Sequence, residues 1–245
     1  MTAGIDEKSI IMVTGASAGL GRAVCIALGG QGANVIALAR DADGLAGTQG
    51  MVEQAGGRCL CIPFDLLEFE AYDKLFLALK DQIPHLDGLI HCAGSLQYCT
   101  PMQYVKTDDF RSMLDIHLTA PNLLTRSLLP LIRRAPEATV IFTSCEMLDR
   151  DMANWHAYGL AKRALGYAAA MWHAEHADKP YRFVTINPGR MRTALFRRAY
   201  LGMHPSEVPA PEEAAEGFLH ILTAAADAVN GKALQLEDAL RLQAG

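Results

Sequence analysis

A tyrosine and a lysine stand four residues apart at Tyr158 and Lys162, in a stretch over 153–177 that we predict to be one long helix. Four residues make about one helical turn, so the phenol and the ammonium project from the same face. A nearby positive charge lowers the pKa of a phenol from its usual value of about 10, which allows proton exchange at neutral pH. The pair suits general acid catalysis on a carbonyl oxygen, or general base catalysis on an alcohol. The same spacing also occurs in surface pairs of amphipathic helices.

A glycine-rich turn near the N-terminus strengthens the catalytic interpretation. A buried apolar strand is predicted over 10–14, and a helix that ends near Gly29 and Gly30 follows; between them the chain reads Thr14-Gly15-Ala16-Ser17-Ala18-Gly19-Leu20-Gly21. Glycines let the backbone turn sharply and approach a bulky anion. A helix N-terminus offers unpaired N–H groups and partial positive charge to a phosphate. We therefore predict that the turn binds a dinucleotide.

The same residues permit a different enzyme class. Gly15 to Gly19 match the G-x-S-x-G nucleophile elbow of α/β-hydrolases, with Ser17 as the nucleophile. An elbow needs earlier strands and an oxyanion-hole loop, and only about a dozen residues precede Gly15. A serine hydrolase is thus a remote alternative. A third interpretation is an ordinary strand-to-helix turn without a ligand.

The composition indicates a globular chain that acts on small molecules. Of its 245 residues 51% are hydrophobic and 20% are charged, which is enough for a sizeable core without a disordered tract. A net charge of −5 gives no basic face for nucleic acid or an anionic membrane. The chain shows neither a signal-peptide pattern nor an apolar run of membrane-spanning length, so we expect a cytoplasmic protein. Six cysteines without C-x-x-C pairs indicate neither a metal site nor disulfides.

Strands and helices alternate along the whole chain. Apolar runs predict strands over 10–14, 33–39, 59–64, 88–91, 139–143 and 183–187, and helices are predicted over 43–55, 69–82, 107–118, 121–134 and 153–177. Such alternation predicts an α/β fold, a Rossmann-type doubly wound parallel sheet with helices on both faces. No linker divides the chain, so we expect a single domain over 1–245 that binds ligands at the carboxyl ends of its strands.

Arg40 lies at the carboxyl end of the second predicted strand, about 20 positions past the glycines. A residue in this position meets the adenosine ribose of a bound dinucleotide. An acid accepts bonds from the free hydroxyls of NAD(H), whereas an arginine suits the 2′-phosphate of NADP(H). Arg40 therefore favours NADP(H), while the adjacent Asp41 keeps NAD(H) possible. A solvated loop charge is the alternative interpretation of Arg40.

Together these motifs resemble the short-chain dehydrogenase/reductase family over nearly the whole chain. Besides the glycine turn, Tyr158 and Lys162, the resemblance rests on Asp65-Leu66 after the third strand, His91-Cys92-Ala93-Gly94 after the fourth, and Asn187-Pro188-Gly189 followed by Thr193. It implies a seven-stranded sheet whose last strand is 232–236, and a homodimer or homotetramer.

The resemblance also implies which residues hold the cofactor. It places Asp65 near the adenine, Ala93 and Gly94 against the adenosine ribose, and 188–193 beside the nicotinamide. The full expected set is Gly15, Ser17, Gly19, Leu20, Gly21, Arg40, Asp65, Leu66, Ala93, Gly94, Tyr158, Lys162, Pro188, Gly189 and Thr193. A lid over 193–209 is expected to close over the substrate.

Two expected catalytic positions depart from the family pattern. The catalytic serine falls at Cys145, and a thiol is a weaker and longer hydrogen-bond donor than a hydroxyl. The neighbouring Ser144 replaces it only if the strand end turns, since adjacent strand residues point to opposite faces. The catalytic asparagine falls at His117, whose imidazole either holds a relay water to Lys162 or titrates near neutral pH and repels that lysine.

We therefore predict an NADP(H)-dependent oxidoreductase that interconverts a carbonyl and a secondary alcohol on a small molecule. Tyr158 would be its proton donor or acceptor and Lys162 the electrostatic partner. A cofactor-binding relative with little or no catalysis is the alternative. Two further clusters, the histidine pair 173 and 176 and the arginines 190, 192, 197 and 198, are interpreted as solvated faces.

Overall fold

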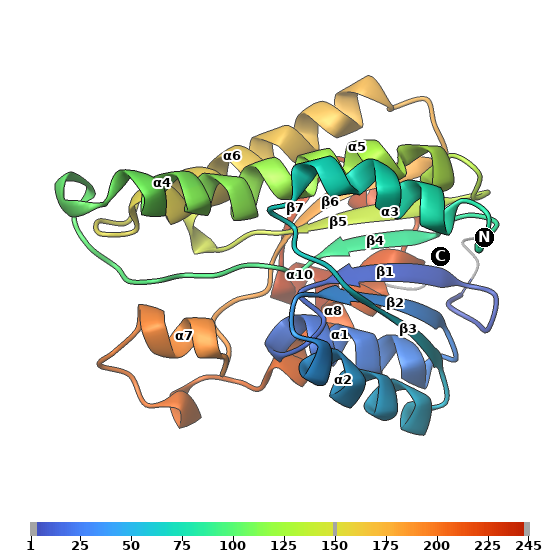
Figure 1. Ribbon diagram of the computed structural model, residues 1–245, viewed down its shortest axis with the longest axis horizontal. Coiled ribbons are helices and arrows are strands. Elements are labelled where there is room, and N and C mark those ends of the chain that lie inside the picture. The colour runs from blue at the N-terminus through green and yellow to red at the C-terminus, as the bar shows by residue number, and fades with distance from the viewer. Residues whose placement is uncertain (1–3, 149–150, 243–245) are drawn as a thin grey trace.

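The computed structural model describes residues 4–148 and 151–242, and its centre is one sheet of seven parallel strands (Figure 1). The strand order is β3-β2-β1-β4-β5-β6-β7. The strands are β1 (Ile10–Thr14), β2 (Asn34–Ala39), β3 (Arg58–Pro63), β4 (Gly88–His91), β5 (Ala138–Thr143), β6 (Tyr181–Asn187) and β7 (Ala233–Gln235). Because the chain runs outward from β1 to β3 and then returns to β4, the order reverses between β1 and β4. Dinucleotides bind at such a reversal point.

Helices cover both faces of the sheet, as the alternation predicts. They are α1 (Gly19–Gly30), α2 (Ala42–Ala55), α3 (Tyr72–Leu79), α4 (Thr107–Leu114), α5 (Ala120–Ile132), α6 (His156–Glu175), α7 (Ala194–Ala199), α8 (Pro211–Thr223), α9 (Ala226–Val229) and α10 (Leu236–Leu240). In Figure 1, α3 to α6 lie on one face, and α1, α2 and α8 on the other. The doubly wound α/β prediction is confirmed.

Each face of the sheet has its own hydrophobic core. In β1, Ile11 and Val13 join the core under α1 and α8, whereas Ile10 and Met12 join the core under α3 and α5. Successive strand residues point to opposite faces, so a strand that is buried on both sides is apolar throughout. This double burial holds the carboxyl ends of the strands rigid.

The predicted helix boundaries are wrong at three places. The helix expected from residue 69 begins with a 3-10 turn over Phe69–Ala71. The helix expected over 107–118 changes into a π-helix at Asp115–Thr119 that leads directly into α5, whose second residue is Pro121. Proline has no N–H to continue the α-helical ladder, which gives a reason for the wider turn. The helix expected from 153 begins at His156, because Asn154 and His156 have positive φ angles of 71° and 30°.

The segment expected to be a lid, 193–209, leaves the sheet after β6. Thr193 caps α7, since its hydroxyl oxygen accepts a hydrogen bond of 3.2 Å from the Phe196 N–H. In Figure 1, α7 stands apart from both helix layers, on the side of the carboxyl strand ends. None of the helices in the described part of the chain is long and apolar enough to cross a membrane.

Candidate active site

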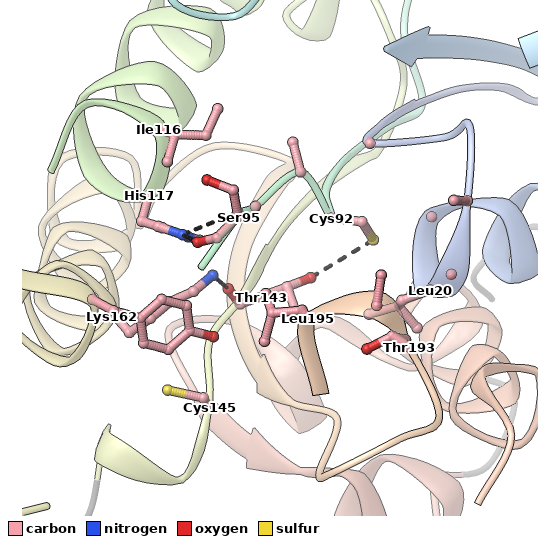
Figure 2. Close-up of a pocket in the computed structure, with 18 of the residues that line it drawn as sticks. Leu20, Cys92, Ser95, Ile116, His117, Thr143, Cys145, Lys162, Thr193 and Leu195 are labelled. Carbon is pink, nitrogen blue, oxygen red and sulfur yellow. Dashed lines mark hydrogen bonds between the residues drawn. The ribbon is translucent and has the colours of Figure 1, made fainter. Parts of the chain in front are cut away.

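A crevice of about 1050 Å³ runs along the carboxyl ends of the strands, and every site residue expected from the sequence lines it. Arg40 and Asp65 lie on its walls together with Tyr158, Phe196 and Tyr200. Figure 2 shows a close-up in which Leu20 and Thr193 lie opposite His117 and Lys162. The crevice therefore combines the predicted dinucleotide turn and the predicted proton-transfer pair in one site.

The glycine turn is shaped by close backbone contacts. Gly15 has a φ of +68°, and a Cβ atom there would lie 2.7 Å from the Ala93 Cα. The Ala93 N–H donates a 3.1 Å hydrogen bond to the Thr14 hydroxyl, which joins the turns after β1 and β4. Ala18, which precedes α1, makes no side-chain cap, so the first N–H groups of the helix stay available to an anion.

Arg22 anchors this turn, although it is not among the site residues expected from the sequence. Its guanidinium donates to the Ser17 carbonyl, to the Gly44 carbonyl at 3.1 Å and to the Thr48 hydroxyl at 3.0 Å. An arginine in the first turn of a helix is unfavourable for the helix dipole, and this mismatch is the signal that would have identified it. The fixed charge adds to the positive end of α1.

At the end of the crevice beside β2, Arg40 presents a positive charge. Its side chain is 70% exposed and its guanidinium lies 3.8 Å from the Asp65 carboxylate. Asp41 instead caps α2, because its carboxylate accepts a 3.0 Å hydrogen bond from the Gly44 N–H. A carboxylate that caps a helix is less free to bind ribose hydroxyls, so this geometry favours a 2′-phosphate at Arg40.

Tyr158 and Lys162 are both buried on α6. The Lys162 ammonium donates a 2.7 Å hydrogen bond to the Thr143 carbonyl and lies 5.9 Å from the centroid of the Tyr158 ring. Burial lowers the pKa of Lys162. Burial, followed by the neighbouring Cys145, raises the pKa of the Tyr158 phenol well above its usual value. The expected lowering of the Tyr158 pKa is therefore wrong for the protein alone, because burial of the phenol raises it.

Cys145, the residue expected at the family's serine position, is the second residue after β5. Its thiol donates a 3.4 Å hydrogen bond to the Met147 sulfur, and its side chain packs against the small buried cluster that contains Tyr158. Burial raises the pKa of this thiol, so it stays protonated at neutral pH. Ser144 does not take over, since its hydroxyl donates a 3.1 Å hydrogen bond to the Lys162 carbonyl. The thiol is thus the group that faces the phenol.

His117 comes from the π-helix and packs edge-on against Tyr158, with the ring centroids 4.7 Å apart. Its Nε2 lies 2.6 Å from the Ser95 carbonyl, a contact that Figure 2 shows. Burial, followed by the charge of Lys162, lowers the pKa of His117 to about 3. The imidazole therefore stays neutral, and the alternative in which it charges and repels Lys162 is wrong.

A second cavity of about 10 Å³ lies behind these side chains, lined by His117, Lys162 and Thr143 among others. A cavity measured in this way needs about 10 to 15 Å³ to hold one water molecule. The His117 Nδ1 atom is buried and has no partner among the described residues. Nε2 lies 2.6 Å from the Ser95 carbonyl and 3.3 Å from the Ser95 N–H, and the shorter contact favours the tautomer with the proton on Nε2. In that tautomer Nδ1 is an acceptor. A water here would connect that acceptor with Lys162.

The comparisons with known proteins agree with this geometry. The family model described as short chain dehydrogenase matches residues 9–202. This chain belongs to the short-chain dehydrogenase family. The uncharacterized oxidoreductase YciK of Escherichia coli K12 is 30% identical to this chain over 216 residues. The match covers 87% of this chain and 85% of YciK.

Solved structures match this chain over nearly its whole length. A protein from Pseudomonas syringae described as a short chain dehydrogenase has a TM-score of 0.89 and 31% identity, and the match covers 96% of this chain and 98% of that one. A protein from Escherichia coli CFT073 with the same description, complexed with NADPH, has a TM-score of 0.90 and 28% identity over 95% and 98% of the two chains. The family assignment removes the serine hydrolase alternative.

The arginine cluster and the histidine pair, both expected to be solvated, are each partly buried in the structure. Arg190 bonds Glu146 through both carboxylate oxygens and lines the crevice, while Arg192, Arg197 and Arg198 are exposed. His176 is buried against Trp172, whose carbonyl lies 2.9 Å from its Nδ1. Within residues 4–148 and 151–242, no group of three or more metal-ligating side chains occurs.

Proposed function

We propose that this protein is an NADP(H)-dependent oxidoreductase that interconverts a carbonyl and a secondary alcohol on a small molecule. The observation that carries the proposal is the buried Tyr158 phenol, which faces the same crevice as the glycine turn and has Lys162 beside it. Tyr158 would exchange the proton with the substrate oxygen, and the lid would hold the rest of the substrate.

The crevice fits a dinucleotide at several points. The backbone around Gly15 has no room for a Cβ atom, and the α1 N-terminus offers its N–H groups to a pyrophosphate. Arg40 would bind the 2′-phosphate, Asp65 and Ala93 would flank the adenosine, and Thr193 would lie beside the nicotinamide. NADPH in a structure with a TM-score of 0.90 to this one supports the choice of phosphorylated cofactor. The bound cofactor supplies the hydride.

Tyr158 would act as the acid in carbonyl reduction. Burial raises its pKa, so the phenol keeps its proton at neutral pH and would give it up to the more basic oxygen that forms as the carbonyl is reduced. The Lys162 ammonium, fixed by the Thr143 carbonyl, then stabilises the phenolate. A water held by the neutral His117 in the small cavity would return a proton through Lys162.

One observation favours a second candidate, a cofactor-binding relative with little turnover. The thiol of Cys145 is a weaker hydrogen-bond donor than a serine hydroxyl. Its S–H points to the Met147 sulfur, which is a weak acceptor and would not orient it towards a substrate. If the substrate oxygen is poorly held, chemistry slows while cofactor binding is unaffected.

A binding titration combined with a substrate screen separates the two candidates. Protein fluorescence should report NADPH binding in the micromolar range, and NADPH absorbance should fall with at least one aldehyde, diketone or quinone. Tight NADPH binding without turnover on any carbonyl would support the second candidate. Absence of binding by both NADPH and NADH would refute both.

A further inference from the structure

Three side chains from distant parts of the chain meet at the crevice wall near Cys145. Glu146 follows β5, Arg190 follows β6, and Tyr200 follows α7. The Arg190 Nη2 atom lies 3.0 and 3.1 Å from the two Glu146 carboxylate oxygens. The Tyr200 hydroxyl donates a 2.6 Å hydrogen bond to the same carboxylate. The Arg190 guanidinium also lies 4.5 Å from the centroid of the Tyr200 ring. We call Glu146, Arg190 and Tyr200 the clasp.

The clasp fixes the lid to the catalytic wall. Tyr200 stacks on Phe196 of α7 at 5.1 Å between ring centroids, and packs against Trp155 at 5.5 Å. Trp155 in turn packs against Tyr158 at 5.5 Å. A continuous row of aromatic rings therefore extends from the lid to the catalytic phenol. Because Glu146 holds both Arg190 and the Tyr200 hydroxyl, it sets the position of this row.

The charges of the clasp cancel within the crevice. Glu146 and Arg190 are partly buried, with side chains 22% and 37% exposed. A bidentate pair between guanidinium and carboxylate is strong and directional, so an anionic substrate would have to displace Glu146 to reach Arg190. The neighbouring lining is apolar and rich in sulfur, and comprises Cys145, Met147, Trp155, Leu195 and Phe196.

We propose that Glu146 makes this site selective for neutral, largely apolar carbonyl compounds, because it occupies Arg190 and holds Tyr200 in place as an apolar wall. Glu146 is a positioning and specificity-determining residue that acts through its two partners. The inference rests on the proposed function and narrows its substrate class.

Two substrates with the same aromatic group test the selectivity. 1-Phenyl-1,2-propanedione is neutral, whereas phenylglyoxylate carries a carboxylate beside its ketone. For the wild type, kcat/KM with NADPH should be at least about tenfold higher for the dione. In Glu146→Gln the released guanidinium should recruit the carboxylate, and the preference for the dione should fall at least about fivefold.

A second substitution separates charge from loosened packing. In Glu146→Gln combined with Arg190→Leu no cation is released, so the preference for the dione should return. The exposed Arg197 of the same lid provides the matched control, and Arg197→Gln should keep the wild-type preference. An unchanged ratio in Glu146→Gln, or a fallen ratio that persists in the double variant, would overturn the proposal.

Hydrogen exchange of the lid gives a readout that needs no turnover. The amides of residues 194–203 should exchange faster in Glu146→Gln and in Tyr200→Phe than in the wild type, while those of β1 stay protected. Equal exchange rates in all three proteins would refute the clasp. If NADPH binds and no carbonyl reacts, the proposed function and the substrate class fail together, and the exchange rates alone decide whether the clasp exists.

Discussion

At the scale of single residues, the surroundings of Tyr158 decide what its phenol can do. A thiol at position 145 and an imidazole at position 117 pack against the phenol ring, at the positions where the sequence resemblance leads us to expect a hydroxyl and an amide. The thiol is a longer and weaker donor than a hydroxyl. The neutral imidazole, by contrast, retains an acceptor that can hold a water. Under the proposed function the two residues would therefore differ in effect: Cys145 would hold the substrate oxygen more weakly than a serine, and His117 would keep the proton path.

Cys145→Ser should raise kcat/KM for a diketone by about threefold to tenfold, because the serine hydroxyl donates a stronger hydrogen bond to the substrate oxygen. Steady-state rates followed by NADPH absorbance measure this change. Cys145→Ala is the matched control and should not exceed the wild type. A Cys145→Ser rate at or below that of the wild type would show that the thiol does not limit the reaction.

At the scale of elements, the alternation of apolar strands and amphipathic helices was enough to predict the sheet, because its central strands, such as β1, β4 and β5, are buried on both faces. The helix ends and the π-helix at Asp115–Thr119 were not predictable in this way, since they depend on local features such as the prolyl nitrogen of Pro121 and the positive φ of His156. The clasp was also missed. Glu146 and Arg190 are 44 residues apart and meet only when β5 and β6 pair.

The proposed cofactor preference depends on Arg40 at the end of β2. Arg40→Ala should weaken NADPH binding by about tenfold or more, because the guanidinium would bond the 2′-phosphate, and should leave NADH binding nearly unchanged. Fluorescence titration with both cofactors measures the difference, and Arg197→Ala controls for the loss of one exposed arginine. Equal losses for both cofactors would assign Arg40 to the adenosine in general instead of the phosphate.

At the scale of the whole molecule, two neutral histidines lie inside the fold beside Lys162. His91 stacks on Phe142 with ring centroids 5.0 Å apart and bonds Thr125, and its pKa, like that of His117, is lowered to about 3 by burial and then by Lys162. In the unfolded chain a histidine has a pKa of about 6.5. Below that pH the unfolded state binds protons that the folded state does not.

The free energy of unfolding should therefore fall as the pH falls from about 6.5 towards 3, by about 2 kcal/mol for each histidine at about pH 5. Urea unfolding at several pH values measures this slope. His117→Asn should remove roughly half of the contribution made by the two histidines, since asparagine does not titrate. A slope in His117→Asn equal to that of the wild type would mean that His117 is charged in the folded protein.

Proton transfer by the phenol of Tyr158 is the central step of the proposed function, and single-turnover reduction of the best carbonyl found in the screen tests it most directly. Tyr158→Phe keeps the ring that packs against Trp155 and His117, so NADPH should bind within about threefold of the wild-type affinity. The rate of NADPH oxidation at saturating substrate should fall by at least about a hundredfold. A Tyr158→Phe protein that binds NADPH and reduces the carbonyl at the wild-type rate would contradict the account.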